Sequence, residues 1–261
     1  MYRPRLLPVI QLYDGQAVKT VRFNNPTYVG DAFNAVRLFS QMQVDGLILL
    51  DIEASKGNKP IHQHFIRQLA DMAAMPLAIG GGISSLSQAE FLLQSGAEQI
   101  IVCTAAFLNP SFVTELSKTF GKSSVVVSFD IQQTSAGQFN LTTASGRVVL
   151  NGTIKEWLTI MEEAGAGEIL LHSVDRDGTQ TGYDEGAIST FIGHTQLPIT
   201  ILGGASPHTD FRSLHAKFPI NGYAAGSRFL FYKNSNSVLI NYPNNHRALF
   251  LENAHERVKS S

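Results

Sequence analysis

The stretch EILLHSVDRDG at residues 168–178 repeats the pattern of GLILLDIEASKG at residues 46–57. Each begins with an apolar run typical of a buried strand and ends in charged residues and a glycine. Three more pairs recur at a similar spacing: VIQL (9–12) with SFDI (128–131), MPLAIGGGISS (75–85) with LPITILGGASP (197–207), and IIVCTAAF (100–107) with GYAAGSRF (222–229). Such self-similarity predicts two related halves of four strand–helix units each.

Apolar runs alternate with amphipathic segments along the whole chain. Strands are expected at 6–10, 46–51, 76–79, 99–103, 124–130, 168–172, 199–202 and 222–225, and helices at 32–42, 61–72, 85–94, 110–120, 154–164 and 185–195. Continuous apolar strands separated by helices favour a parallel sheet covered by helices. We therefore expect one α/β domain over residues 1–261, a (βα)8 TIM barrel with half-barrels at about 1–120 and 121–245 and a tail at 246–261. A doubly wound open sheet is the alternative.

The composition is that of a globular protein with a large core. Of the 261 residues 44% are hydrophobic and 16% charged, and the net charge of −1 gives no electrostatic reason to expect nucleic acid or an anionic membrane as a partner. The single cysteine, Cys103, excludes an internal disulfide. Because the N-terminus has too short an apolar run for a signal peptide and no stretch is long enough to span a membrane, a cytoplasmic location is expected.

Glycines and small hydroxyl residues recur where strands are expected to end. Glycines at 80–82 and 203–204 end the third and seventh strands, and Thr104 and Ser227 follow the fourth and eighth. In a (βα)8 barrel the active site is built at these strand ends. Glycine lets backbone N–H groups approach an anion closely, which favours two phosphate sites related by the repeat. Tight turns are the alternative explanation.

Titratable side chains lie at the same strand ends. Asp130 is a candidate general acid or base, with a structural hydrogen-bonding role as the alternative, and Asp51 has the same ambiguity. His172 is either a group that titrates near neutral pH or a satisfied hydrogen-bonding residue. In the loop after it, Asp177 is a candidate ligand contact and Asp175 a loop brace.

No metal or cofactor is indicated by the sequence. Eight histidines provide only one close pair, His62 and His64, and one cysteine cannot build a zinc site alone. The segment IGGGIS lacks the spacing and the acidic partner of a dinucleotide-binding fingerprint.

Taken together, these motifs resemble the cyclase subunit of imidazole glycerol phosphate synthase, from histidine biosynthesis. The resemblance covers about residues 5–229 and rests on PVIQLYDGQAVK, LLDIEAS, IGGGISS, VCTAAFLNP, VSFD, GAGEILLHSVDRDGTQTGYD and LGGAS. It implies a (βα)8 barrel, a substrate with two phosphates, and a separate glutaminase partner in a heterodimer. Ammonia released by that partner would cross the barrel core to the site at the opposite end.

The resemblance also assigns roles to individual residues. Asp130 matches one of two catalytic aspartates, and Lys19 matches the lysine of the loop after the first strand. The phosphate site of the first half would include Gly82, Cys103 and Thr104. That of the second half would include Asp177, Gly178, Gly204, Gly226 and Ser227.

The main departure from the family pattern is Gln11, which occupies the position of the other catalytic aspartate. An amide keeps hydrogen bonds and approximate size but cannot exchange a proton near neutral pH. Loss of a positioned general acid or base typically lowers the rate roughly 10²–10⁴-fold. Cys103 and His172 also depart from the family, which has asparagine and threonine at these positions. The chain's own cyclase activity is therefore expected to be impaired.

The ammonia entrance departs from the family as well. The resemblance places a ring of alternating charges at the bottom of the barrel, matched here by Arg5 and Glu168. Gly46 replaces the second glutamate of that ring and Gln99 its lysine. Since one charge of each sign is lost, the ring is expected to stay neutral and to be more open.

The tail SRFLFYKNSNSVLINYPN (227–244) resembles tails of divergent relatives encoded with surface-polysaccharide genes, although an ordinary strand and helix is the alternative. This resemblance implies a third, amidotransferase partner and ammonia delivery to an acetamidino sugar, as in lipopolysaccharide biosynthesis. Three other hypotheses remain: a genuine synthase, the sibling isomerase barrel of the same pathway, and a non-catalytic scaffold that binds a phosphorylated metabolite.

Overall fold

The computed structural model describes residues 3–52, 54, 63–231, 238–246 and 248–250. Eight parallel strands form a closed barrel in the order β1, β4, β5, β6, β7, β10, β11, β12, and β12 pairs with β1 to complete the ring. Their bounds are Arg5–Tyr13 (β1), Leu47–Asp51 (β4), Leu77–Gly80 (β5), Gln99–Val102 (β6), Val125–Gln133 (β7), Glu168–Ser173 (β10), Ile199–Leu202 (β11) and Gly222–Ala225 (β12). The predicted (βα)8 barrel is thus confirmed, and the doubly wound sheet is excluded.

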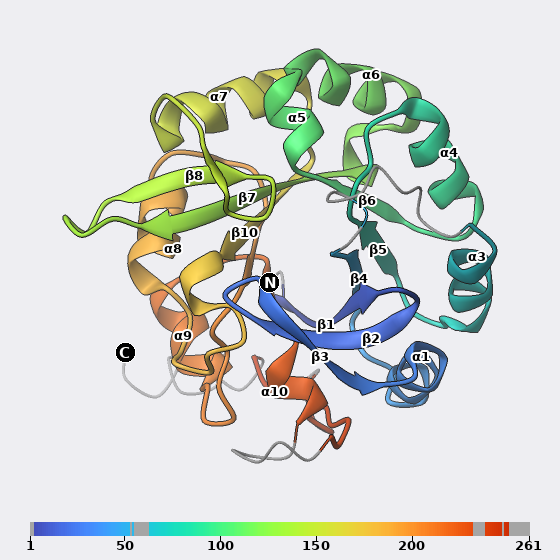
Figure 1. Ribbon diagram of the computed structural model, residues 1–261. Coiled ribbons are helices and arrows are strands. Elements are labelled where there is room, and N and C mark those ends of the chain that lie inside the picture. Colours follow the sequence, from blue (N-terminus) through green and yellow to red (C-terminus); the bar gives the residue numbers. More distant parts are fainter. Residues whose placement is uncertain (1–2, 53, 55–62, 232–237, 247, 251–261) are drawn as a thin grey trace, which may run out of the picture.

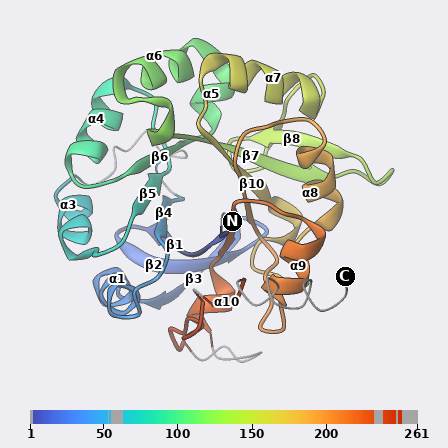
Figure 2. The same cartoon turned by 180° about the vertical axis from the view of Figure 1, so that it is seen from behind.

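Helices surround the barrel on its outside, as both ribbon views show (Figures 1 and 2). They are α1 (Ala32–Gln41), α3 (Gln63–Met72), α4 (Leu86–Gln94), α5 (Thr104–Leu108), α6 (Pro110–Phe120), α7 (Ile154–Ala164), α8 (Glu185–Ile192), α9 (Phe211–Lys217) and α10 (Ser227–Leu230). Two short 3₁₀ turns lie at Lys122–Ser124 and Val174–Arg176. All six predicted helices are present, whereas α5, α9 and α10 were not predicted. Within the described ranges, no helix has the length and apolar character needed to cross a bilayer.

Helix α7 illustrates why these segments are helical. Thr153 and Glu156 form a reciprocal capping box at its start, and Gly165 ends it in the left-handed conformation. Buried Ile154, Leu158 and Met161 recur at helical spacing, so one face packs on the barrel.

Two antiparallel hairpins extend the barrel at its C-terminal end. The first, β2 (Gln16–Val21) with β3 (Asn24–Gly30), continues from β1, and the second, β8 (Phe139–Thr143) with β9 (Val148–Val149), continues from β7. They follow the first strand of each predicted half. Neither hairpin was predicted from the sequence, and both contribute residues to the site.

Inward-facing side chains fill the barrel with an apolar cluster that is distinct from the larger core between strands and helices. Its members are Leu7, Val9, Ile48, Ala78, Ile101, Val126, Leu170, Leu202 and Ala224, with Leu50 packed against them. Alternate residues of parallel strands point inward, which explains why the strands read as continuous apolar runs. Of the expected tail at 246–261, residues 251–261 lie outside the described residues, as do residues 61–62 of the second predicted helix.

Candidate active site and barrel openings

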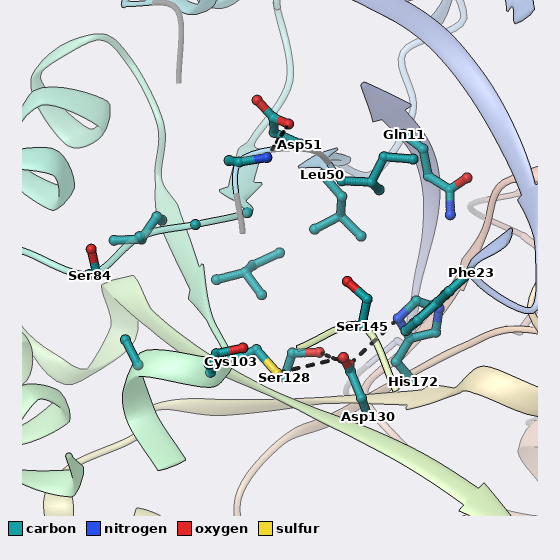
Figure 3. A pocket seen from close by; sticks show the side chains of 18 of the residues that line it. Gln11, Phe23, Leu50, Asp51, Ser84, Cys103, Ser128, Asp130, Ser145 and His172 are labelled. Carbon is teal, nitrogen blue, oxygen red and sulfur yellow. Dashed lines mark hydrogen bonds and ion pairs between the residues drawn. The ribbon is translucent and has the colours of Figure 1, made fainter. Parts of the chain in front are cut away.

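The C-terminal ends of the strands surround a cavity of about 270 Å³, which we call the upper cavity (Figure 3). The predicted residues that line it are Gln11, Asp51, Gly82, Cys103, Thr104, Asp130 and His172. Gln11 on β1 and Asp130 on β7 come from strands at opposite positions in the ring, and both face the same space. The sequence repeat therefore correctly placed these two positions across one cavity.

Asp130 lies within β7, where two side chains donate hydrogen bonds to its carboxylate. Ser128 Oγ donates to its Oδ1 at 2.9 Å and the Cys103 thiol donates to its Oδ2 at 3.6 Å. Burial raises the pKa of Asp130, and the opposing effects of nearby His172 and the two donors are smaller. A buried carboxyl group with a raised pKa is a candidate for proton transfer.

The raised pKa of Asp130 gives a prediction about stability. Because folding favours its protonated form, its ionisation opposes folding, and this cost grows as pH rises through the raised pKa. We expect Asp130→Asn to raise the Tm at pH 7.5, because the neutral amide avoids the cost of burying an ionised carboxylate. Thermal unfolding at pH 7.5 and pH 4 should show the gain shrinking at the lower pH. An equal or larger gain at pH 4 contradicts this account.

The side-chain amide of Gln11 forms hydrogen bonds within the fold. Its Oε1 accepts from the Thr20 backbone N–H at 2.9 Å, and its Nε2 lies 3.5 Å from Asp177 Oδ1 as a donor. The Thr20 hydroxyl lies 3.0 Å from Gln11 Oε1 and 2.5 Å from Asp177 Oδ2, so its single proton is directed to the carboxylate. Gln11 thus ties β1, the first hairpin and the loop after β10 together.

Cys103 acts as a donor and not as a nucleophile. Burial, followed by the nearby Asp130 carboxylate, raises the pKa of the thiol well above its ordinary value. A thiol in this state stays protonated, whereas nucleophilic cysteines are thiolates in electropositive surroundings.

The first predicted phosphate site borders the upper cavity. Gly82 follows β5 with a φ of 65°, and Thr104 is the first residue of α5. The Thr104 hydroxyl accepts from the Ala144 backbone N–H of the second hairpin at 3.2 Å. Gly82 and Thr104 are thus placed beside Asp130, while Cys103 is turned toward that carboxylate.

The second predicted phosphate site lies across the barrel mouth from the first, at the ends of β11 and β12, and its cavity is smaller than the upper cavity. Lys19, Asp177, Gly178, Gly204, Gly226 and Ser227 line a cavity of about 30 Å³, whose wall also includes Gln11 and Thr20. Burial lowers the pKa of Lys19, and its Nζ lies 4.9 Å from the centre of the Phe231 ring. Gly178 must be glycine here, because its φ is 67° and a Cβ would collide with the Thr20 carbonyl oxygen.

Two loop carboxylates have structural contacts. Asp51 Oδ1 accepts from the Ala54 backbone N–H at 3.0 Å, and Asp175 Oδ2 accepts from the Gln133 backbone N–H at 2.6 Å. The latter contact is the loop brace that was predicted for Asp175.

The opposite end of the barrel has a second opening, the lower cavity, of about 130 Å³. Glu168 is its central acceptor: Arg5 and Thr200 donate to Oε1 at 2.5 and 2.6 Å, and Gln99 donates to Oε2 at 3.2 Å. Gly46 also lines this cavity, and a Cβ there would lie 2.9 Å from the Leu7 side chain. The four predicted positions are therefore brought together, and Thr200 is an additional member that was not predicted.

An apolar layer separates the two cavities. Ile101 lines both of them, and Leu50 lines the upper one, while Ile48, Ala78, Val126 and Leu170 line the lower one. Burying a charge in such a layer is costly, so the layer disfavours ions far more than small neutral molecules.

Sequence reasoning missed the site residues supplied by the hairpins and by an inward-facing serine. Thr20, Phe23, Ser128 and Ser145 all line the upper cavity. Only Ser128 had a usable signal, since it precedes Asp130 by two residues and faces the same side of the strand.

No group of three histidine, cysteine, aspartate or glutamate side chains in the described part of the chain is arranged to hold a metal ion. Of the pair noted in the sequence, His64 is exposed on α3, and His62 lies outside the described residues.

Comparison with known proteins shows which family the sequence matches. Residues 5–235 match the profile of the histidine biosynthesis protein family. A putative imidazole glycerol phosphate synthase subunit hisF2 from Pseudomonas aeruginosa is 38% identical over 93% of this chain and 97% of its own length. A putative HisF subunit from Leptospira interrogans is 40% identical over 94% and 96%. The HisF subunit of Streptomyces coelicolor is 35% identical over 79% and 82%.

Proposed function

The chain belongs to the histidine biosynthesis protein family as a HisF-like cyclase subunit, and on this premise we propose that it conducts ammonia from a glutaminase partner to the upper cavity. The partner docks at the lower opening and forms a heterodimer with the barrel. The ligand of the upper cavity carries phosphate, which Gly82 and Thr104 on one side and Gly204 and Ser227 on the other would bind.

The alignment of the two cavities carries this proposal. The lower cavity begins at the neutral cluster of Arg5, Glu168 and Gln99 and reaches the apolar interior at Ile101. The upper cavity begins at the same Ile101 and ends beside Asp130. A polar mouth, an apolar passage and a second polar site are suited to a small neutral nucleophile that must not be protonated on the way.

We further propose that the ammonia serves the building of an acetamidino sugar for a surface polysaccharide, with a third amidotransferase as partner. Gln11 supports this second proposal. Its amide is hydrogen-bonded to Thr20 and Asp177 and, having no proton to exchange near neutral pH, cannot replace a catalytic carboxylate. The resemblance of the tail supports it as well.

Turnover of the histidine-pathway substrate tests this proposal. With ammonium chloride as nitrogen source, we expect kcat to lie roughly 10²–10⁴-fold below that of a HisF subunit, because one carboxylate of the pair is missing. The Streptococcus mutans HisF subunit, 32% identical to this chain, is a suitable reference measured in parallel. Equal rates would contradict the proposal.

A genuine synthase of histidine biosynthesis is the second candidate function. Family membership and the retained Asp130 favour it. Expression of the chain in a histidine auxotroph that lacks its HisF subunit distinguishes the two, since growth at the wild-type rate requires efficient cyclisation.

A further inference from the structure

Three hydrogen-bonded residues cross the mouth of the barrel. Gln11 lies on β1 and Asp177 in the loop after β10, and in the ring β11 and β12 are the strands between them. Thr20 of the first hairpin joins the two, because its backbone N–H donates to Gln11 and its hydroxyl donates to Asp177. The Gln11 amide itself lies 3.5 Å from Asp177 Oδ1 as a donor. We call Gln11, Thr20 and Asp177 the bridge.

The bridge marks the border between the upper cavity and the second phosphate site. The cavity of the second site is lined by the ends of β11 and β12, with Gly204 and Ser227. The upper cavity is lined by the ends of β4, β5, β6, β7 and β10. Gln11 and Thr20 line both cavities. Because these side chains separate the two spaces, a ligand that fills both has to displace part of the bridge.

Displacing the bridge breaks buried hydrogen bonds. Thr20 is 2% exposed and Asp177 is 7% exposed. The Asp177 carboxylate also accepts from the Phe23 backbone N–H at 3.3 Å, and its backbone carbonyl accepts from Arg22 at 3.0 Å. The hairpin rests directly on this loop, since a Cβ on Gly178 would lie 2.0 Å from the Thr20 carbonyl oxygen. Hydrogen bonds to a buried carboxylate are among the costlier ones to break.

The second site offers little that would offset this cost. Its cavity of about 30 Å³ has room for about two water molecules, whereas the upper cavity has about 270 Å³. Among the described residues that line it, the charged side chains are Lys19 and Asp177, whose charges cancel. Lys19 Nζ also lies 4.9 Å from the centre of the Phe231 ring. A second phosphate would therefore enter a small site without excess positive charge.

We propose that the bridge makes this chain selective for ligands that carry a single phosphate. Such a ligand places its phosphate at Gly82 and Thr104 and its body in the upper cavity, and the bridge stays closed. A ligand with a phosphate at each end reaches Gly204 and Ser227 only when the bridge opens. The inference rests on the proposed function, which it deepens by naming the class of ligand.

The first test compares two probes that differ by one phosphate, ribulose 5-phosphate and ribulose 1,5-bisphosphate. Their Kd values for the purified chain are measured by isothermal titration calorimetry. We expect the bisphosphate to bind no more than about threefold more tightly than the monophosphate. A second phosphate bound without cost would tighten binding roughly tenfold or more, which is the effect of one hydrogen bond to a charged group.

The second test opens the bridge by mutation. Thr20→Val removes the hydroxyl that donates to Asp177, but keeps the shape of the side chain and the backbone N–H that donates to Gln11. We expect the Kd of the bisphosphate to fall roughly tenfold while that of the monophosphate stays within about threefold. Thr20→Ser keeps the hydroxyl and is the matched control, with both Kd values near those of the unchanged protein. A purely structural role for Thr20 would change the Tm or affect both probes alike.

Three results would overturn the inference. They are a bisphosphate Kd at least about tenfold below that of the monophosphate in the unchanged protein, equal changes for both probes in Thr20→Val, and no binding of the monophosphate. If Thr20→Val does not fold, as judged by circular dichroism, the comparison in the unchanged protein still decides. None of these results affects the ammonia passage, which is judged by the origin of the product nitrogen.

Discussion

Replacing Gln11 by aspartate is expected to raise the ammonia-dependent turnover of the histidine-pathway substrate roughly 10²–10⁴-fold, the usual effect of a positioned general acid or base. Position 11 faces the upper cavity from the side opposite Asp130, so a carboxylate there restores a pair across the ligand. The Thr20 backbone N–H, which now donates to Gln11 Oε1, is able to donate to that carboxylate. The measurement is kcat at saturating ammonium.

Gln11→Asn is the matched control for this prediction. Asparagine has the length of aspartate but cannot exchange a proton near neutral pH, so its kcat should stay near that of the unchanged protein. If the aspartate and asparagine variants have equal kcat, the missing carboxylate does not limit the reaction, and the explanation of Gln11 as a broken catalytic pair is wrong.

The second large effect, on glutamine-dependent turnover, is expected from a larger side chain in the barrel interior. Ala78 on β5 belongs to the inward-facing apolar cluster and lines the lower cavity of about 130 Å³. Ala78→Leu adds three carbon atoms to this space, and because closely packed interiors have few voids larger than a water molecule, it should close the passage. We expect turnover supported by glutamine and the glutaminase to fall by roughly tenfold or more, because the larger side chain fills space in the lower cavity through which the proposed route of ammonia runs.

The same variant supplies its own control when ammonium replaces glutamine. Ammonia from solution reaches the upper cavity directly, so turnover on ammonium chloride should remain nearly unchanged. Ile48→Leu alters the same layer at constant volume and should leave both activities intact. An equal loss of both activities in Ala78→Leu would indicate a damaged barrel and not a blocked passage.

The barrel itself was predictable because its signals are local and repeated. Parallel strands buried on both faces, such as β7 and β10, read as continuous apolar runs, and α7 carries a complete set of helix signals. The repeat alone relates Gln11 to Asp130. The spacing of the repeated motifs along the chain was sufficient for this relation, because the C-terminal ends of all the strands of a barrel lie at one face.

The hairpins were not predictable for an equally physical reason. Their turns place Arg22, Phe23, Ala144 and Ser145 in the left-handed region, with φ values of 52°, 61°, 51° and 62°. Asparagine or glycine normally marks such turns, and Asn25 and Gly146 also have positive φ here, but the four other residues adopt this conformation in the context of tertiary contacts. The bond from the Arg22 backbone N–H to the Asp177 carbonyl oxygen is one of these contacts.

Which side chains form hydrogen bonds with one another inside the site also could not be derived from the sequence. The strand-end position of Asp177 suggested a ligand contact, but its carboxylate is bonded to Thr20 and to the Phe23 backbone N–H. That His172 Nε2 is buried without a hydrogen bond among the described residues is visible only in three dimensions, because its surroundings are built by residues from several segments.

The central claim is that ammonia crosses the barrel from a glutaminase to the upper cavity. The most direct measurement supplies glutamine labelled with ¹⁵N in its amide to the complex of this chain with a glutaminase from the same genome, in a large excess of unlabelled ammonium. The Gln11→Asp variant gives enough product for mass spectrometry. The account predicts that the product nitrogen carries the label of the glutamine amide despite the excess in solution. A product whose label is diluted to the ratio in bulk solution would contradict it.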